Sequence, residues 1–439
     1  MKKILMYILL ILSIFMVGCA SKNGEASSLI GRKDYGMYAT DGAPDASYSP
    51  SYSSEYVSED ASVSDEPYIP MDGEKPIEEV EPELPQSGQL TASVVFDNDK
   101  YDFWKSLITK GQDDEGSLYQ YINTYKFDTT NRIKVTTKGI VGAKVTIDGK
   151  YSGLTDSNGV VYLFPSSKDS YNLEISYKDN NGKTVTITET ITEDYEYIPS
   201  EEVDSNKNLL QIMFVIDTTG SMGDEIRYLQ SEITSVINRV KEENPNVVIE
   251  LALVFYRDFG DQYVTKSFDF TTNINSQNKN LGKQYADGGG DWEEAVHEGF
   301  KEANNQSWKE EAKTKLLVFV ADAPCHTKDV DSVIKEVNSF CEKGIRVISV
   351  ASSGIDKGTE FLFRSICIET NGAYGYLTND SGIGGYHVEA TIEEKPVVEY
   401  LNNMLVRLIN GFYTGQFADP IPWRGQSAQE NVVPEELPE

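Results

Sequence analysis

Three oxygen-bearing side chains, Asp217, Thr219 and Ser221, stand at alternate positions directly after a long apolar run. The run covers residues 209–216 and is interrupted by one glutamine, which is typical of a strand buried on both faces. Carboxylate and hydroxyl oxygens at the end of such a strand, beside a tight glycine turn, suit a hard divalent cation such as Mg²⁺ or Mn²⁺. The alternative is that Asp217 and Thr219 only cap the helix that follows.

Two later stretches repeat this placement of acidic residues. A glycine run is flanked by Asp287 and Asp291, and Asp322 follows another apolar run at residues 315–321. Strand ends in a parallel sheet lie side by side on one edge, where open α/β sheets bind their ligands. We therefore expect Asp217, Asp322 and the glycine-rich loop to share one face.

The elements that must position these residues alternate along the chain. Strands are predicted at 209–216, 247–255, 263–270 (an edge strand), 315–321, 345–351 and 373–377, and helices at 224–241, 292–304, 330–343, 359–369 and 396–409, with a short helix or loop at 273–285. Strands and helices that take turns with short links indicate an α/β fold with a doubly wound, mostly parallel, Rossmann-like sheet.

This combination of motifs resembles the von Willebrand factor type A domain and its metal-ion-dependent adhesion site, over residues 208–412. Asp217-x-Thr219-x-Ser221 is similar to the family's first motif, and Asp322 to the acidic residue that closes the site. Two longer strings resemble a subgroup of the family: Ala321-Asp322-Ala323-Pro324-x-His326 and Gly288-Gly289-Gly290-Asp291-x-x-Glu294.

The middle loop departs from the family pattern. Many members place a threonine hydroxyl where this chain has Gly290, so Asp287 or Asp291 must act instead, directly or through water. Both alternatives stay open. His326 and Glu294 are expected in the outer shell of the metal.

The resemblance implies a binding function rather than catalysis. The cation, Mg²⁺ or else Mn²⁺ or Ca²⁺, would keep a coordination position that an acidic residue of a protein partner completes. A structural or assembly role, with the metal used for stability only, is the first alternative, and a hydrolase is the second. The adjacent Cys325 and His326 invite a nucleophile–base pair, but neighbours in one loop rarely point at each other. We expect no enzyme activity.

The amino-terminal sequence predicts a localisation outside the cytoplasm. Lys2 and Lys3 precede an apolar stretch at residues 4–17, and the sequence before Cys19 resembles a bacterial lipobox. The resemblance implies a membrane lipoprotein, acylated at Cys19 and facing the extracytoplasmic side. A net charge of −31 argues against nucleic-acid binding.

The remaining chain is divided by composition. Short alternating runs separated by turn formers predict a β-sandwich. Gly142-Ala143-x-Val145 and Thr155-Asp156-x-x-Gly159 resemble the carboxypeptidase-regulatory-like or Cna-B-like modules, and this resemblance implies a spacer or stalk. The cysteine count predicts no obligatory disulfide framework, though the sequence leaves room for one bridge. The expected organisation is a signal peptide at 1–18, a disordered acidic linker at 19–90, a connecting segment at 91–130, the β-sandwich at 131–198, the A domain at 208–412 and a disordered tail at 413–439.

Overall fold

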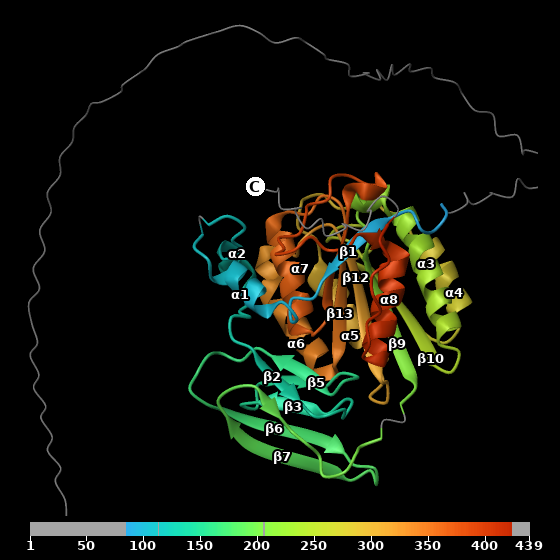
Figure 1. Cartoon of the computed structure of the whole chain (residues 1–439). Coiled ribbons are helices and arrows are strands. Elements are labelled where there is room, and N and C mark those ends of the chain that lie inside the picture. Colours follow the sequence, from blue (N-terminus) through green and yellow to red (C-terminus); the bar gives the residue numbers. More distant parts are fainter. Residues whose placement is uncertain (1–84, 113, 205–206, 424–439) are drawn as a thin grey trace, which may run out of the picture. The chain divides into compact units, whose positions relative to one another are not determined.

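The computed structural model describes residues 85–423 except 113, 205 and 206 (Figure 1). The predicted signal peptide, Cys19 and nearly all of the acidic linker lie outside the described residues and stay predictions. No helix of the described part is both long enough and apolar enough to span a bilayer.

An eight-stranded mixed sheet, mostly parallel at its centre, forms the core of the α/β region, as the sequence predicts. Its strands, in spatial order, are β11 (Thr265–Thr271), β10 (Val248–Tyr256), β9 (Leu209–Asp217), β12 (Thr314–Ala321), β13 (Ile345–Ala351), β14 (Ala373–Leu377), β1 (Thr91–Val95) and β15 (Glu399–Tyr400). From β9 the chain first builds β10 on one side and later β12 on the other side. The carboxyl end of β9 is therefore a topological switch point.

Helices cover both faces of this sheet (Figure 1). One face is covered by α5 (Val296–Asn305), α6 (Val330–Lys343) and α7 (Lys357–Glu369), and the other by α3 (Ile226–Glu243), α4 (Ile274–Gly282) and α8 (Leu401–Thr414). Alternate side chains of β9 enter the two apolar clusters: Met213 and Val215 lie on one side, and Phe214 and Ile216 on the other. This two-sided burial is the reason that the run lacks polar alternation.

Residues 91–130, expected as a connecting segment, belong to the α/β region. β1 pairs antiparallel with β14, and α1 (Tyr101–Thr109) and α2 (Gln120–Tyr125) lie against α7, where Trp104 stacks on Phe361. The predicted linker also ends earlier than residue 90. The backbone N–H groups of Gly88, Gln89 and Leu90 all donate to Glu232 Oε1. Nothing in the five residues of β1 indicates that they pair with β14, which lies so far along the chain.

Between β1 and β9 the chain forms two small sheets that share one apolar core, which we call the β module (residues 133–196). The first sheet contains β5 (Val160–Leu163), β2 (Ile133–Thr136) and β8 (Tyr195–Glu196), and the second β4 (Tyr151–Leu154), β3 (Lys144–Ile147), β6 (Tyr171–Lys178) and β7 (Thr184–Ile191). The β module is therefore inserted between two strands of the large sheet, and not in series before it as a spacer would be. Its kinship to the carboxypeptidase-regulatory-like modules stays a prediction.

Three boundaries differ from the predicted ones. The helix expected from residue 292 begins at Val296, because the Glu294 N–H donates to the Pro324 carbonyl and holds the preceding residues extended. The last helix is α8, later than the predicted 396–409. Beyond it the tail is ordered as far as residue 423: Phe417 packs on Phe412, and the Trp423 N–H donates to the Val398 carbonyl.

Candidate metal centre

The carboxyl end of β9 carries the first part of the site. Asp217 and Thr219 are fully buried, and Ser221 is exposed in a short 3-10 turn, Gly220–Asp224. The Thr219 amide and hydroxyl both donate to Asp217 Oδ1, over 2.9 and 2.7 Å, and the Thr219 and Ser221 hydroxyl oxygens lie 3.3 Å apart. The three predicted oxygen donors are therefore brought together in the structure.

Asp322, directly after β12, adds a second buried carboxylate beside Asp217. Burial, and after it the charge of Asp322, raise the pKa of Asp217 to about 7. Burial also raises the pKa of Asp322 to about 6, against a hydrogen bond from Ser221 that lowers it. The effect of the Asp322 charge on Asp217, together with the burial of both, indicates that the two carboxylates lie close together in desolvated surroundings.

The buried acid of the glycine-rich loop is Glu294, which the sequence predicts in the outer shell of the metal. Glu294 is buried, and its pKa rises to about 9 because of burial first and then the charges of Asp217 and Asp258. A Cβ atom placed on Gly289 would lie 3.1 Å from Glu294 Oε1 and 3.5 Å from the Thr219 Cβ. Glu294 thus faces the pocket of the first motif.

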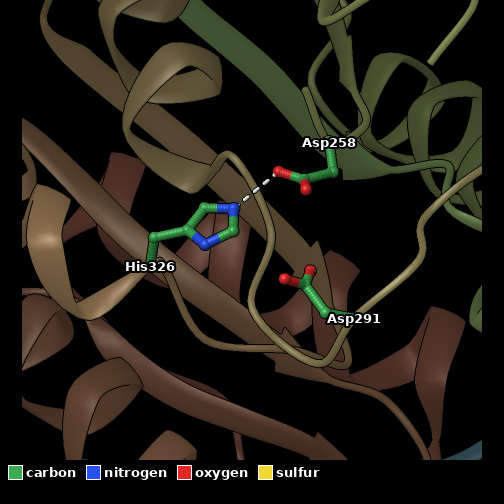
Figure 2. A group of neighbouring side chains, drawn as sticks. All are labelled: Asp258, Asp291 and His326. Atoms are coloured by element: carbon green, nitrogen blue, oxygen red, sulfur yellow. Dashed lines mark hydrogen bonds and ion pairs between the residues drawn. The ribbon is translucent and has the colours of Figure 1, made fainter. Parts of the chain in front are cut away.

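The two residues proposed for the middle-loop ligand point elsewhere. Asp287 is exposed, and its carboxylate pairs with the Arg257 guanidinium over 3.4 Å. Asp291 groups with Asp258 and His326 (Figure 2). The choice between Asp287 and Asp291, directly or through water, therefore stays open. Glu294 is the acid of this loop whose pKa responds to the charges of Asp217 and Asp322.

Asp261 ties the loop after β10 to the glycine-rich loop. Its Oδ2 accepts from the Asp258 N–H at 3.0 Å and from the Gly289 N–H at 2.9 Å. Gly288 has a φ of +81°, and a Cβ atom placed on it would lie 2.4 Å from the Asp261 carboxyl. Any larger residue at this position would therefore clash. The Gly220 N–H donates to the Gly288 carbonyl, which ties this loop to the first motif.

The buried oxygens test whether the residues present fit a cation. Asp217 Oδ2, Asp322 Oδ1 and Glu294 Oε2 are all buried without a hydrogen-bond partner among the described residues. Buried acceptors of this kind normally have partners. Carboxylate and hydroxyl oxygens are the donors that Mg²⁺, Mn²⁺ and Ca²⁺ take, so this set fits a hard divalent ion.

Cys325 is poorly placed for nucleophilic chemistry. Its thiol is fully buried, and burial raises its pKa to about 12. The neighbouring His326 is hydrogen bonded to Asp258 through Nε2. Cys325, Cys341 and Cys367 are free thiols in the structure.

Asp258 and Glu225 are site residues that the sequence reasoning passed over. Asp258 follows β10, so the rule that selected Asp217 could have found it. Glu225 precedes α3, is buried, accepts the Ser353 N–H, and lies 3.0 Å from His387 Nε2. Nothing in its local sequence marks it.

With this geometry in place, comparison with known proteins identifies the α/β region. Residues 211–388 match the family model of the von Willebrand factor A domain. We call these residues the A-domain region. The match agrees with the fold predicted from the first motif and Asp322.

Two curated proteins are similar to parts of the A-domain region. The alpha-protein kinase vwkA of Dictyostelium discoideum is 24% identical over 164 residues, which cover 37% of this chain and 26% of that protein. A putative ariadne-like RING finger protein, R811 of Acanthamoeba polyphaga mimivirus, is 29% identical over 137 residues, 31% of this chain and 13% of that protein. The chain thus spans about a quarter or less of these relatives.

Among solved structures, the conserved hypothetical protein BatB of Bacteroides thetaiotaomicron is similar at 14% identity and a TM-score of 0.28. The alignment covers 39% of this chain and 92% of BatB.

Proposed function

We propose that this chain is a membrane-anchored, extracytoplasmic binding protein whose A-domain region captures a protein partner through a divalent cation. Asp217, Thr219, Ser221 and Asp322 would hold the cation, with Glu294 as the carboxylate from the middle loop. When bound, the cation supplies a positive charge and a coordination position that a partner's Asp or Glu fills.

One observation carries this proposal: three buried carboxylates lie close enough to raise one another's pKa values, and each keeps an oxygen without a partner among the described residues. Buried like charges are unfavourable unless a cation compensates them. Thr219 fixes one oxygen of Asp217 and leaves the other free to coordinate. The protein therefore orients its ligands before the ion arrives.

The surroundings of the pocket support a protein partner. Four large aromatic side chains are exposed on loops at the same edge of the sheet: Phe259 (48%), Tyr285 (54%), Trp292 (43%) and Tyr386 (70%). Exposed aromatic residues are enriched in binding interfaces. We expect the partner to present an acidic residue flanked by apolar groups.

The anchoring part of the proposal depends on the sequence before Cys19. A lipid at that residue would hold the A-domain region near a bacterial membrane. The strongly negative chain disfavours nucleic acid as the partner.

The test uses the full chain and Mn²⁺ as the probe. We expect Mn²⁺ to bind with an exchangeable water, visible as enhanced proton relaxation, and we expect Asp217→Ala to abolish this binding. Peptides that carry one Asp should displace the water, whereas matched Asn peptides should not. A bound Mn²⁺ without exchangeable water, or peptide binding that survives chelation, would contradict the proposal and favour a metal used for stability alone.

A further inference from the structure

A second group of metal-ligating side chains lies beside the pocket of Asp217 and Asp322. One ligand atom from each of Asp258, Asp291 and His326 lies within 4.8 Å of the other two. Figure 2 shows the three side chains pointing toward one another from three different loops. The loops follow β10, precede α5 and follow β12, all at one edge of the sheet.

The group differs from an ordinary patch of surface acids because it contains an oriented imidazole. The His326 side chain is only 8% exposed, and its Nε2 lies 2.7 Å from Asp258 Oδ1. Glu293 approaches the other ring nitrogen at 3.5 Å. Metal-ligating histidines typically have a carboxylate at the ring nitrogen that does not bind the metal, and Glu293 takes that place if Nε2 is the ligand.

Two observations show unused ligand capacity. The exposed Asp291 carboxylate makes no hydrogen bond or ion pair with any residue that the structure describes. The buried Glu294, which lies close to both Asp217 and Asp258, keeps Oε2 without a partner in the same part of the chain. This unpartnered buried oxygen therefore belongs to a residue that feels the charges of acids in both groups.

We propose that Asp258, Asp291 and His326 form a second cation site, separate from the Asp217–Asp322 site, with Glu294 between the two. One nitrogen and two oxygen ligands suit a borderline ion, and Zn²⁺ is the one that this set fits best. Ligand atoms around a tetrahedral Zn²⁺ lie about 3.4 Å apart, given bonds of about 2.1 Å. The widest separation, at most 4.8 Å, must shrink by up to about 1.4 Å, which the exposed Asp291 side chain can do by changing rotamer. The 2.7 Å hydrogen bond between His326 and Asp258 must open by about 0.7 Å as both bind the ion.

The division of ligands has a chemical reason. The Asp217–Asp322 site offers carboxylate and hydroxyl oxygens alone, which favour Mg²⁺, whereas the second site adds an imidazole, which favours Zn²⁺. Asp261 ties the Asp258 loop to the glycine-rich loop, and the Gly220 N–H ties the glycine-rich loop to the first motif, so the two sites stand on linked loops. The cation at each site would reduce the repulsion felt by Glu294.

The test titrates Zn²⁺ into the full chain while saturating Mg²⁺ occupies the oxygen site. We expect one Zn²⁺ per chain and a nitrogen but no sulfur ligand in X-ray absorption at the zinc edge. Asp291→Asn should weaken Zn²⁺ binding at least tenfold, and His326→Gln should remove the nitrogen signal. Asp217→Asn should leave Zn²⁺ binding intact, and His297→Gln, which alters a nearby histidine outside the group, should do the same.

The result can overturn the proposal in three ways. Absence of Zn²⁺ binding would leave His326 and Asp258 as a simple ion pair between loops. Loss of Zn²⁺ with Asp217→Asn would mean a single shared site, and a sulfur ligand would mean that a cysteine binds the ion. Because Asp291 is exposed, Asp291→Asn is expected to fold even if His326→Gln does not.

Discussion

The amide and the hydroxyl of Thr219 both donate to the same oxygen of Asp217, Oδ1, over 2.9 and 2.7 Å. The remaining oxygen, Oδ2, is buried and has no hydrogen bond of normal geometry within the described chain, and the buried Tyr256 hydroxyl beside Asp217 has none either. The two residues therefore act as one unit, in which Thr219 orients the carboxylate that Asp217 presents.

Removal of the Thr219 hydroxyl should weaken cation binding without unfolding the protein. Thr219→Val keeps the side-chain shape but loses both the hydrogen bond that orients Asp217 and the hydroxyl oxygen proposed as a ligand, so we expect Mg²⁺ affinity to fall about 10- to 100-fold. Thr219→Ser keeps the hydroxyl and serves as the matched control, with affinity close to that of the wild type. Calorimetric titration of both variants measures the difference, and equal affinities for Val and Ser would contradict it.

Stability without metal should fall as the pH rises from about 4 to about 7. Unfolded aspartates titrate near pH 3.9, whereas Asp217 and Asp322 have folded pKa values of about 7 and about 6. The folded state therefore binds more protons in this window, and the unfolding free energy decreases with pH. Mg²⁺ replaces those protons, so its thermal stabilisation should be larger at about pH 7.5 than at about pH 5. An equal shift in Tm at both pH values would refute this assignment.

Glu294→Gln should make the metal-free protein more stable and the metal site weaker. The folded carboxyl has a pKa of about 9, so at neutral pH the native state carries a buried acid that would ionise freely when unfolded. We expect a gain of about 1–3 kcal/mol at about pH 7.5 and little change at about pH 4.5. Chemical denaturation at the two pH values measures it.

The control for this variant is Glu298→Gln, which alters a partly exposed acid on α5 and should shift stability by less than about 0.5 kcal/mol. If Glu294→Gln were destabilising at neutral pH without metal, Glu294 would be ionised and paired in the native state.

The segment before the β module should be required for a stable A-domain region. Arg364 is fully buried and donates to both oxygens of Asp97, at 2.9 and 2.5 Å, and to Glu360. Asp97→Ala leaves a buried cation short of its partner, which typically costs about 3–5 kcal/mol. The exposed Asp102→Ala is the control.

A fragment limited to residues 208–412 should show the same loss, because it lacks Asp97 and β1 together. Urea unfolding of the full chain and the fragment tests this expectation, and matching midpoints would disprove it.

Local patterns predicted the centre of the sheet well. Buried strands such as β13 and β14, and the amphipathic α6, begin and end where apolar periodicity predicts. The convergence of Asp217 and Asp322 also follows from sequence, because parallel strand ends share an edge.

Features that depend on distant contacts were not predictable in this way. The five residues of β1 pair with β14 nearly 300 positions later, and no local signal names that partner. Glu294 lies in the pocket because its backbone bonds to Pro324 and delays the start of α5. The orientation of Asp291 toward His326 likewise depends on how three loops meet.

The insertion of the β module between β1 and β9 determines how the protein would respond to mechanical load. A pull that arrives from the residue 85 side first meets the hydrogen bonds of residues 88–90 to Glu232 and then β1, which is hydrogen bonded to β14 and β15 within the large sheet. If the second point of attachment is the candidate metal centre, the load would pass through those strand pairs and the β module would lie outside its path. An anchored A-domain region built in this way would pass tension directly to the large sheet. The carboxyl ends of β9 and β12 in that sheet hold the candidate metal centre.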